Sequence, residues 1–543
     1  MHLKSTVQHW HYRFGYLLFM SFMWLLGSCS AHRSFGASSN QNTTEIVASK
    51  ANLQPQKKDY SNLLNQPNSS HKKTSQVFKD PERSFRGVWV ATVANIDWPK
   101  HPNDSFEKMQ EDYKSLLKFY KDLHFNTVIV QVRAAGDALY PSKLAPWSKY
   151  LSGKQGLQPQ TNTDPLEWLI ETTHAYGMDF HAWINPYRAT MSMETKELSQ
   201  DHDFYTHREW LIPYGNKYYY NPGLPEVREH MLAVVRELVN TYQIDGLHLD
   251  DYFYPYKIEK QSFKDEISFK MYGSDMSLGD WRRQNVNSLI AGIFNEIKQT
   301  KPWVSFGVSP FGVWKNKGTD PKGSDTRAGQ TTFEDLYADP LTWMREGWID
   351  YLVPQLYWSM NYELAAHKTL VDWWVDQKSK SKIYIGYGPY KIFNNADNAW
   401  DQPNELGDQI AYGNEKEVIE GQVFFSAKSL MQNSLASVVV SLKQRAFNEV
   451  VMAPLVGAAK KADSIQWNAT AHTDAQETLR VSSIASEWAK YIPYFLNAEL
   501  NIYEAGAIRA THIPFKEAEN IEFIKGINSY GQLSAPIPVK RMR

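Results

Sequence analysis

Eight short apolar segments suited to β-strands alternate along this chain with segments of helical period, and this alternation limits the possible folds more than any other feature. The strand-like segments are 85–95, 127–133, 179–187, 246–252, 304–311, 351–358, 383–390 and 422–430. Between them lie amphipathic segments such as 225–242 and 281–300, with apolar residues at i, i+3 and i+4. Eight strand–helix units are the number that closes a (β/α)8 TIM barrel.

An open, doubly wound sheet would show the same alternation of strands and helices. The barrel is favoured because most of the strand-like segments end in polar or aromatic residues, as expected where functional side chains gather at the C-terminal ends of barrel strands. Examples are Asp97, Asn185, Gln355 and Ser426. No glycine-rich phosphate loop follows the first segment. We therefore expect a TIM barrel.

Residues 245–255, with the sequence DGLHLDDYFYP, contain the strongest candidate for a catalytic site. Leu247 and Leu249 alternate with His248 and Asp250, which is the period of a strand. Asp250 and Asp251 then lie at the C-terminal end of that strand, where barrels carry their chemistry. Repulsion between adjacent carboxylates raises the pKa of one of them, as a general acid requires. The alternative is that the aspartates only cap the turn that follows the strand.

Charge and aromatic content narrow the possible partners. The 58 Lys and Arg residues balance 59 Asp and Glu residues to a net charge of −1, so no overall field draws the chain to nucleic acid. The chain also holds 19 Trp and 31 Tyr, whose flat apolar faces and polar edges suit sugar rings. Large α/β proteins can also carry many aromatic residues for packing alone. A glycan partner is expected, and nucleic acid is not.

The first 28 residues are expected to be a bacterial lipoprotein signal peptide. Leu26, Gly27 and Ser28 precede Cys29 in the pattern of a lipobox, and the apolar run 16–27 is too short to span a bilayer. An ordinary secretory leader is the alternative. Lipidation of Cys29, the single cysteine, would anchor the protein to a membrane of the bacterial cell envelope, facing the periplasm or the exterior.

Composition also divides the rest of the chain. Residues 29–80 are rich in Ser, Asn, Gln and Lys and are expected to form a disordered tether. The barrel is expected over 81–450. Residues 451–543 lose the helical period and are expected to form a small β-rich domain, whose ending NSYGQLSAPI is similar to the last strand of fibronectin type III-like domains.

Five motifs in strand register carry a family resemblance: FRGVWVATVANIDWP, QVRAAGDALYPS, FHAWINPYR, DGLHLDDYFYP and VPQLYW. Together they resemble the bacterial glycosyl hydrolase-like family 10, over roughly Phe85 to Val450. The resemblance implies a TIM-barrel glycosidase of the cell envelope. It also implies that the substrate is peptidoglycan, in particular N-acetylated glycan strands that lack peptides.

A more distant likeness is to family 18 chitinases, which carry DGxDxDxEYP on the fourth strand. This chain departs from that pattern, because His248 replaces the middle Asp and Tyr252 replaces the catalytic Glu. The chitinase mechanism therefore does not transfer directly. Asp250 could still orient an acetamido group, while the acid would come from Asp251 or another strand.

The candidate residues fall into two groups. Asp250, Asp251 and Asp137 are the catalytic candidates, although Asp137 could equally cap its loop. The substrate-binding candidates are Arg133, Asn185, Arg188, His248, Tyr252, Tyr357, Trp358 and Lys428. The two arginines could bind sugar hydroxyls or a lactyl carboxylate, or could hold Asp250 and Asp251 ionised. The tyrosines and the tryptophan are candidate stacking platforms, or barrel packing.

Two other functions remain open at this point. His181 and His248 lie on neighbouring strands near acids, as in a zinc-dependent polysaccharide deacetylase, but no spacing typical of metal ligands supports this. A noncatalytic glycan-binding lipoprotein is the other alternative. The sequence thus predicts a glycoside hydrolase that acts on O-glycosyl bonds, with no cofactor and no metal.

Overall fold

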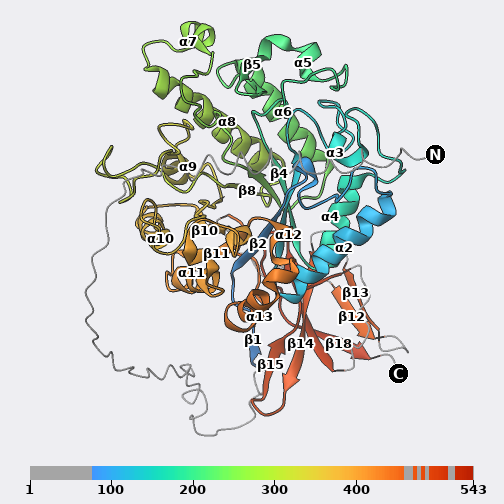
Figure 1. Ribbon diagram of the computed structural model, residues 1–543. Helices are drawn as coiled ribbons and strands as arrows, with labels where there is room; N and C mark the ends of the chain where they lie inside the picture. Colours follow the sequence, from blue (N-terminus) through green and yellow to red (C-terminus); the bar gives the residue numbers. More distant parts are fainter. Residues whose placement is uncertain (1–75, 458–468, 474–477, 484–487, 512–519, 542–543) are drawn as a thin grey trace, which may run out of the picture. The chain divides into compact units, whose positions relative to one another are not determined.

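Eight parallel strands form a closed barrel in the computed structural model, which describes residues 76–457, 469–473, 478–483, 488–511 and 520–541 (Figure 1). In chain order the strands are β2 (Phe85–Val90), β3 (Thr127–Arg133), β4 (Asp179–Ile184), β7 (Gly246–Leu249), β8 (Ser305–Val308), β9 (Tyr351–Leu352), β10 (Lys382–Tyr387) and β11 (Ile419–Phe424). Pairing of β11 with β2 closes the ring. The predicted (β/α)8 TIM barrel is confirmed.

A main helix follows each barrel strand and packs on its outer face (Figure 1). These helices are α2 (Phe106–Asp122), α4 (Pro165–Ala175), α6 (Pro225–Thr241), α8 (Leu278–Thr300), α9 (Pro340–Glu346), α10 (His367–Val375), α11 (Glu405–Asn414) and α13 (Ala436–Arg445). Local signals begin several of them: Ser105 caps α2, and Asp164 caps α4 just before a proline. Strand residues such as Val88 and Val128 meet the helices in one continuous apolar layer.

Large aromatic side chains fill the interior of the barrel. Phe85 stacks on Tyr384 with ring centroids 4.3 Å apart, and Tyr351 lies 5.2 Å from Tyr384 and 5.5 Å from Phe85. Trp89 and Trp183 are buried in the same inner cluster. The barrel is therefore a packed core, and a ligand must bind at an end of it rather than pass through it.

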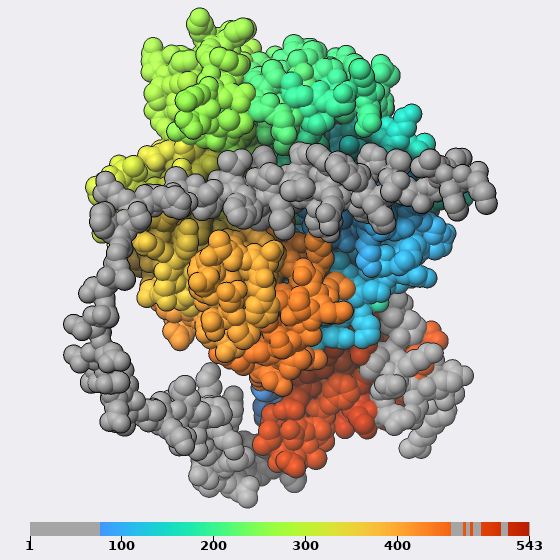
Figure 2. All heavy atoms as spheres, viewed as in Figure 1, coloured from blue at the N-terminus to red at the C-terminus, as the bar shows by residue number. Residues whose placement is uncertain are grey.

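Two connections at the C-terminal end of the strands are long and pack against each other. The connection after β4 holds α5 (Asp203–Thr206) and a hairpin of β5 (Leu211–Tyr214) and β6 (Lys217–Tyr220). The connection after β7 holds α7 (Glu266–Tyr272). The amide of Ile258 donates to the Tyr214 hydroxyl over 2.8 Å, which joins the two connections, and Figure 2 shows them side by side in green and yellow-green.

The C-terminal part of the chain is β-rich, as predicted. Seven strands of the described C-terminal residues form one sheet together with β1 (Phe78–Lys79): β12 (Ala469–Thr473), β13 (Leu479–Ser483), β14 (Trp488–Asn497), β15 (Ile502–Ala505), β16 (Arg509–Ala510), β17 (Ile521–Asn528) and β18 (Ile537–Arg541). They hydrogen-bond in the order β1-β15-β14-β17-β18-β12-β13, and β16 also pairs with β14. The likeness to a fibronectin type III domain stays a prediction.

The chain segment just before the first barrel strand forms β1, which pairs in parallel with β15. Asp80, just after β1, accepts hydrogen bonds from Lys525 and Tyr494 of the C-terminal sheet. Residues 29–75 of the expected tether, the expected signal peptide and Cys29 lie outside the described residues. Within the described part of the chain, no helix combines the length and the apolar character that crossing a bilayer requires.

A largely buried lysine joins the C-terminal sheet to the N-terminal end of the barrel strands. Lys490 of β14 forms an ion pair with Asp179, the first residue of β4, and lies 3.7 Å from Asp245, which directly precedes β7. Asp245 also accepts a hydrogen bond from His174 over 2.7 Å. Burial alone would lower the pKa of Lys490, but Asp179 and Asp245 outweigh it and hold the pKa above its ordinary value. The lysine is therefore charged and fully paired.

Lys490→Met should destabilise the fold, because it removes the ion-pair partner of Asp179 from a largely buried position, while Asp245 keeps its hydrogen bond with His174. The expected loss is about 1–3 kcal/mol of unfolding free energy. Lys118→Met is the matched control, since Lys118 pairs with Asp122 on an exposed helix surface, and it should cost less than about 1 kcal/mol. Urea unfolding of both variants tests this, and equal losses would contradict it.

Candidate active site

Asp250 and Asp251 follow β7 directly at the C-terminal end of the barrel, where the sequence predicted them. Asp250 accepts hydrogen bonds from Asn185 at 3.3 Å, from Gln355 at 3.4 Å and from the backbone amide of Asp251 at 2.8 Å. Three donors from three directions hold this carboxyl group as an acceptor in a fixed orientation.

Asp251 lies in a different environment although it is the adjacent residue. Its carboxyl group is buried and accepts a hydrogen bond from the Tyr256 hydroxyl. Burial raises the pKa of Asp251 well above its ordinary value, and the charge of Asp250 and a hydrogen bond with Asp250 raise it further. Tyr256 and Arg188 act in the opposite direction but do not cancel the rise. The pair therefore combines a carboxyl group whose pKa is raised with a neighbouring carboxyl group that three donors orient.

A chain of amide side chains connects this pair to the neighbouring strands. Asn185 follows β4 and accepts a hydrogen bond from Gln131 of β3 over 2.8 Å while it donates to Asp250. Gln131 in turn accepts from the amide of Val93 over 2.9 Å. On the other side, Gln355 also donates to the carbonyl of Ser309 over 2.8 Å. Both donors to Asp250 are thus fixed by the barrel itself.

Aromatic side chains form the opposite side of the mouth. Tyr357 and Phe425 stack with centroids 6.3 Å apart and an interplanar angle of 28°, and Tyr390 meets Tyr357 edge-on at 6.0 Å. Burial raises the pKa of Tyr357, and Tyr390 and the charges of Asp250 and Asp251 raise it further. An aromatic wall that faces two carboxyl groups is an arrangement suited to a sugar ring.

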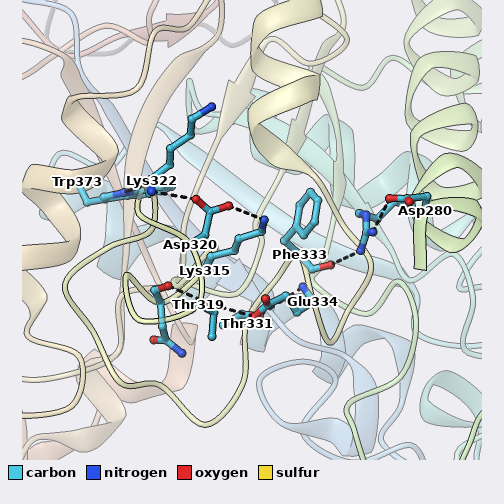
Figure 3. A network of polar contacts seen from close by, with 11 residues as sticks. Asp280, Lys315, Thr319, Asp320, Lys322, Thr331, Phe333, Glu334 and Trp373 are labelled. Carbon is cyan, nitrogen blue, oxygen red and sulfur yellow. Dashed lines mark hydrogen bonds and ion pairs between the residues drawn. The ribbon is translucent and has the colours of Figure 1, made fainter. Parts of the chain in front are cut away.

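Trp358, the neighbour of Tyr357, packs edge-on against Phe311 at 5.5 Å, and Phe311 meets Tyr256 at 6.3 Å. Phe311 begins the long connection between β8 and α9, which Figure 3 shows in part. There Asp320 binds Lys315 over 2.8 Å and the amide of Lys322 over 2.9 Å (Figure 3). The hydroxyl of Thr332, in the same connection, donates to the carbonyl of Phe311 over 2.8 Å and so holds the residue whose ring meets Tyr256.

Asp97 ties the first and last barrel strands together beside the mouth. It accepts hydrogen bonds from the amide of Ala91 at 2.7 Å, from Ser426 at 2.8 Å and from the amide of Lys428 at 2.8 Å. Burial raises the pKa of Asp97 to about 6, although these donors and the charge of Lys428 lower it. The side chain of Lys428, a predicted substrate contact, remains exposed at the rim.

Arg188 lies next to the acid pair on the side of β4. Its guanidinium group stacks over the ring of Tyr252 at 4.1 Å, and its Nη1 donates to the carbonyl of Ala134 over 3.3 Å. The structure thus brings Arg188, Asn185 and Tyr252 near Asp250 and Asp251, and their roles in binding or catalysis stay predictions.

Arg133 and Asp137 belong to a separate buried group. Both are almost fully buried, and the charge on Arg133 interacts with Tyr220, Tyr140 and Asp203 as well as with Asp137. No described residue accepts a hydrogen bond from the guanidinium group of Arg133. The structure does not bring Arg133 or Asp137 into contact with Asp250 or Asp251.

His248 and His181 lie deeper in the barrel than the acid pair. Tyr351 contacts both rings, with its hydroxyl 3.0 Å from Nδ1 of His248 and 2.8 Å from Nδ1 of His181. Nε2 of His248 is occupied by Trp89 at 3.1 Å and by Ser309 at 2.9 Å. The structure therefore places His248 in the interior, below the mouth. Among the described residues, no three His, Cys, Asp or Glu side chains are grouped to hold a metal ion.

A cleft of about 2030 Å³ lies at the other end of the barrel, between the strand beginnings and the C-terminal sheet. Asp245, Lys490, Trp303 and Tyr530 are among the residues that line it. None of the predicted catalytic or substrate-binding residues lines this cleft. The large volume of this cleft therefore does not make it the candidate active site. That site remains at the C-terminal ends of the barrel strands.

Comparison with known proteins shows the family. The model of the family described as "Glycosyl hydrolase-like 10" matches residues 84–402. The chain belongs to this family. The predicted resemblance and the predicted enzyme class, a glycoside hydrolase, are confirmed.

Individual relatives agree with the family assignment. The glycosyl hydrolase YngK of Bacillus subtilis is 45% identical over 359 residues, which cover 65% of this chain and 70% of YngK. The glycosyl hydrolase DigH of Escherichia coli is 38% identical over 337 residues, which cover 59% of this chain and 75% of DigH. Among solved structures, the glycoside hydrolase domain of PgaB (BpsB) from Bordetella bronchiseptica matches with a TM-score of 0.43 and 12% identity, over 66% of this chain and 98% of that domain.

The site of this glycosyl hydrolase-like 10 protein includes residues that sequence reasoning did not assign to it. Tyr256, Gln355, Tyr390 and Phe425 all contact the acid pair or form the aromatic wall. Three of them lie at or just beyond a strand end, which is the one signal available in the sequence. For Tyr256 the only signal is its place in the aromatic run that follows Asp251.

Tyr256→Phe should raise the pKa of Asp251 further. The substitution removes the hydroxyl that donates to Asp251 and keeps the ring, and this hydrogen bond favours the ionised carboxylate. Asp251 should therefore stay protonated to a higher pH in the variant. Infrared difference spectra across a pH titration would follow its protonated carbonyl band, assigned by its absence in Asp251→Asn.

Tyr390→Phe is the control for this titration, because Tyr390 lies in the same mouth and makes no hydrogen bond to Asp251. It should leave the titration of Asp251 where it is in the unaltered enzyme. A band that titrates at the same or a lower pH in Tyr256→Phe would show that the hydroxyl does not set the protonation of Asp251.

Proposed function

We propose that this enzyme cleaves the glycan strands of bacterial peptidoglycan, in particular strands that carry no peptides, with Asp250 and Asp251 as its catalytic residues. The observation that carries the proposal is the contrast between two adjacent carboxyl groups at one strand end. One has a raised pKa and is buried, and the other is held by three donors.

The two environments suit two different roles in glycoside hydrolysis. Asp251, whose pKa is raised, donates a proton to the oxygen of the leaving sugar. Asp250, as the oriented carboxylate, stabilises charge at the anomeric centre or positions the group that attacks it, which includes the acetamido group of an N-acetylated sugar. Each step uses a side chain that the structure places at the C-terminal end of β7.

The walls of the mouth support a carbohydrate as the substrate. Tyr357, Tyr390 and Phe425 offer aromatic faces on one side, while Asn185 and Gln355 add amide groups beside the acids. Sugar rings bind through this combination of flat apolar surface and planar polar groups. The choice of peptidoglycan rests on the family resemblance and on the expected place of the protein in the cell envelope.

Asp250→Asn and Asp251→Asn should each lower glycan cleavage by about 10²-fold or more, because general acid–base groups contribute 10²–10⁴-fold to the rate. Unfolding transitions should change little, since residues at the mouth of a barrel contribute little to its core. The measurement is mass spectrometry of products from purified peptide-free strands incubated with each variant.

Asp137→Asn serves as the comparison variant, because Asp137 lies in the separate group around Arg133. Its activity should stay well above that of the other two variants. Full activity in both Asp250→Asn and Asp251→Asn would remove the catalytic assignment. Release of acetate that depends on a chelatable metal would replace it with the deacetylase alternative.

We also propose that the protein is a lipoprotein of the cell envelope, anchored through Cys29. The lipobox and the short apolar run before it support this. Cys29→Ala should leave the protein unprocessed or release it from the membrane fraction, because several acyl chains anchor a protein stably. Metabolic labelling with a fatty acid checks this, and an unaltered protein that takes up no label and washes off membranes in buffer would contradict it.

A further inference from the structure

We propose that Arg188 and Tyr252 form a carboxylate-binding subsite, which recognises the free lactyl carboxylate of a muramyl residue beside the scissile bond. The proposal rests on the proposed function and adds to it a specific group of the substrate. It predicts that the enzyme distinguishes glycans by the charge on this substituent.

The first observation is that the charge of Arg188 has no ion pair in the described part of the chain. Arg188 is 7% exposed, and its Nε is buried and has no hydrogen-bond acceptor among the described residues. Nη1 has only the carbonyl of Ala134, at 3.3 Å, and the face of the guanidinium group lies on Tyr252. A buried guanidinium group usually has carboxylate partners, because desolvation of an unpaired charge is costly.

The second observation is that the acid pair does not need Arg188 to satisfy its hydrogen bonds. Asn185, Gln355 and an amide donate to Asp250, and Tyr256 donates to Asp251. Arg188 acts on both carboxyl groups only through its charge and forms no ion pair with either of them. Donors of Arg188 therefore remain for an acceptor that the protein does not supply.

The position of Arg188 is fixed by the backbone around it. Arg188 forms an antiparallel bridge with Tyr219 of β6, and the residues on either side of it bond to the same strand. The amide of Tyr220 donates to the carbonyl of Tyr187 over 2.8 Å, and the amide of Ala189 donates to that of Tyr218 over 3.1 Å. The backbone of Arg188 is thus fixed, while the ring of Tyr252 and the carbonyl of Ala134 hold its guanidinium group, so a ligand has less to order on binding.

A carboxylate is the acceptor that matches this group. The planar guanidinium fork binds a carboxylate through two parallel hydrogen bonds, which a neutral amide cannot reproduce. In peptidoglycan the lactyl group of muramic acid carries a free carboxylate only where no peptide is attached, since the peptide converts it to an amide. Arg188 would therefore select unsubstituted strands by charge and not by size alone.

The test compares two ligands that differ in this one group: a short peptide-free glycan fragment and the same fragment with its lactyl carboxylates converted to methylamides. Binding is measured by calorimetry on the full-length Asp251→Asn protein, so that turnover does not interfere. The acid form should bind about 10- to 100-fold more tightly, as expected for hydrogen bonds to charged groups.

Three variants in the same background locate the effect. Arg188→Gln should remove the preference for the acid form, and Arg188→Lys should retain part of it, because lysine keeps the charge but not the fork. Lys428→Met should keep the full preference, since Lys428 lies at the rim by the last barrel strand. Thermal unfolding of each variant checks that the fold is intact.

Several results would overturn the proposal. One is equal binding of the acid and amide fragments, and another is a preference that survives in Arg188→Gln and disappears in Lys428→Met. A fragment of alternating N-acetylglucosamine and glucuronate tests the other source of a sugar carboxylate, and tighter binding of that fragment would assign the subsite to uronic acids. If the unaltered enzyme cleaves neither muramyl fragment, the proposed function fails, while a preference in binding would still support the subsite.

Discussion

Closure of the parallel barrel is the constraint on which the site depends. When β11 pairs with β2, the C-terminal ends of all eight strands meet around one opening. Residues as distant in sequence as Asp97 and Ser426 then lie within hydrogen-bonding distance. Packing of aromatic side chains inside the barrel fills its interior, so a ligand binds at an end of the barrel and not within it. The fold gathers the groups, and the loops determine what they do.

The acid pair shows how neighbouring residues acquire different chemistry from their surroundings. Asp250 meets donors that come from β4 and from the segment after β9. Asp251 accepts a hydrogen bond from the hydroxyl of Tyr256, whose ring meets that of Phe311. Burial disfavours the charged form of Asp251, and the charge of Asp250 disfavours it further, so the pKa of Asp251 is raised. Shape and burial, rather than residue type, separate the two roles.

Periodicity was sufficient to place the strands but not the depth or direction of every side chain. The segments that start at Phe85, Thr127 and Gly246 are strands because apolar runs of the right length are bounded by polar residues. Alternation assigns His248 to the inward face of β7, yet it does not reveal that the ring lies one layer below the mouth. A shift of register between Gln131 and Arg133 changes the face of β3, and no local signal in the sequence marks it.

Contacts between distant segments also could not be predicted from the sequence. Phe78 and Lys79 join a strand more than 400 residues later, and a pair of such length carries no local pattern. Nothing in the local sequence distinguishes Lys490 from the other lysines, and only the fold places it beside Asp179 and Asp245. The acid pair was predictable for the opposite reason, because a strand end is a local feature and the chemistry of two adjacent carboxyl groups needs no distant partner to be recognised.

The length of β7 has a practical consequence for protein engineering. Its four residues span roughly 13 Å. Before the strand, Asp245 contacts Lys490 and His174. After the strand, Asp250 accepts hydrogen bonds from Asn185 and Gln355. Inserting or deleting a single residue would turn the side chains beyond that point to the opposite face of the strand. The contacts of Asp245, of Asp250 or of both would then be lost. Exchange of segments between related enzymes should therefore use junctions outside 245–251, with the exposed turn around Lys260 as a tolerant site.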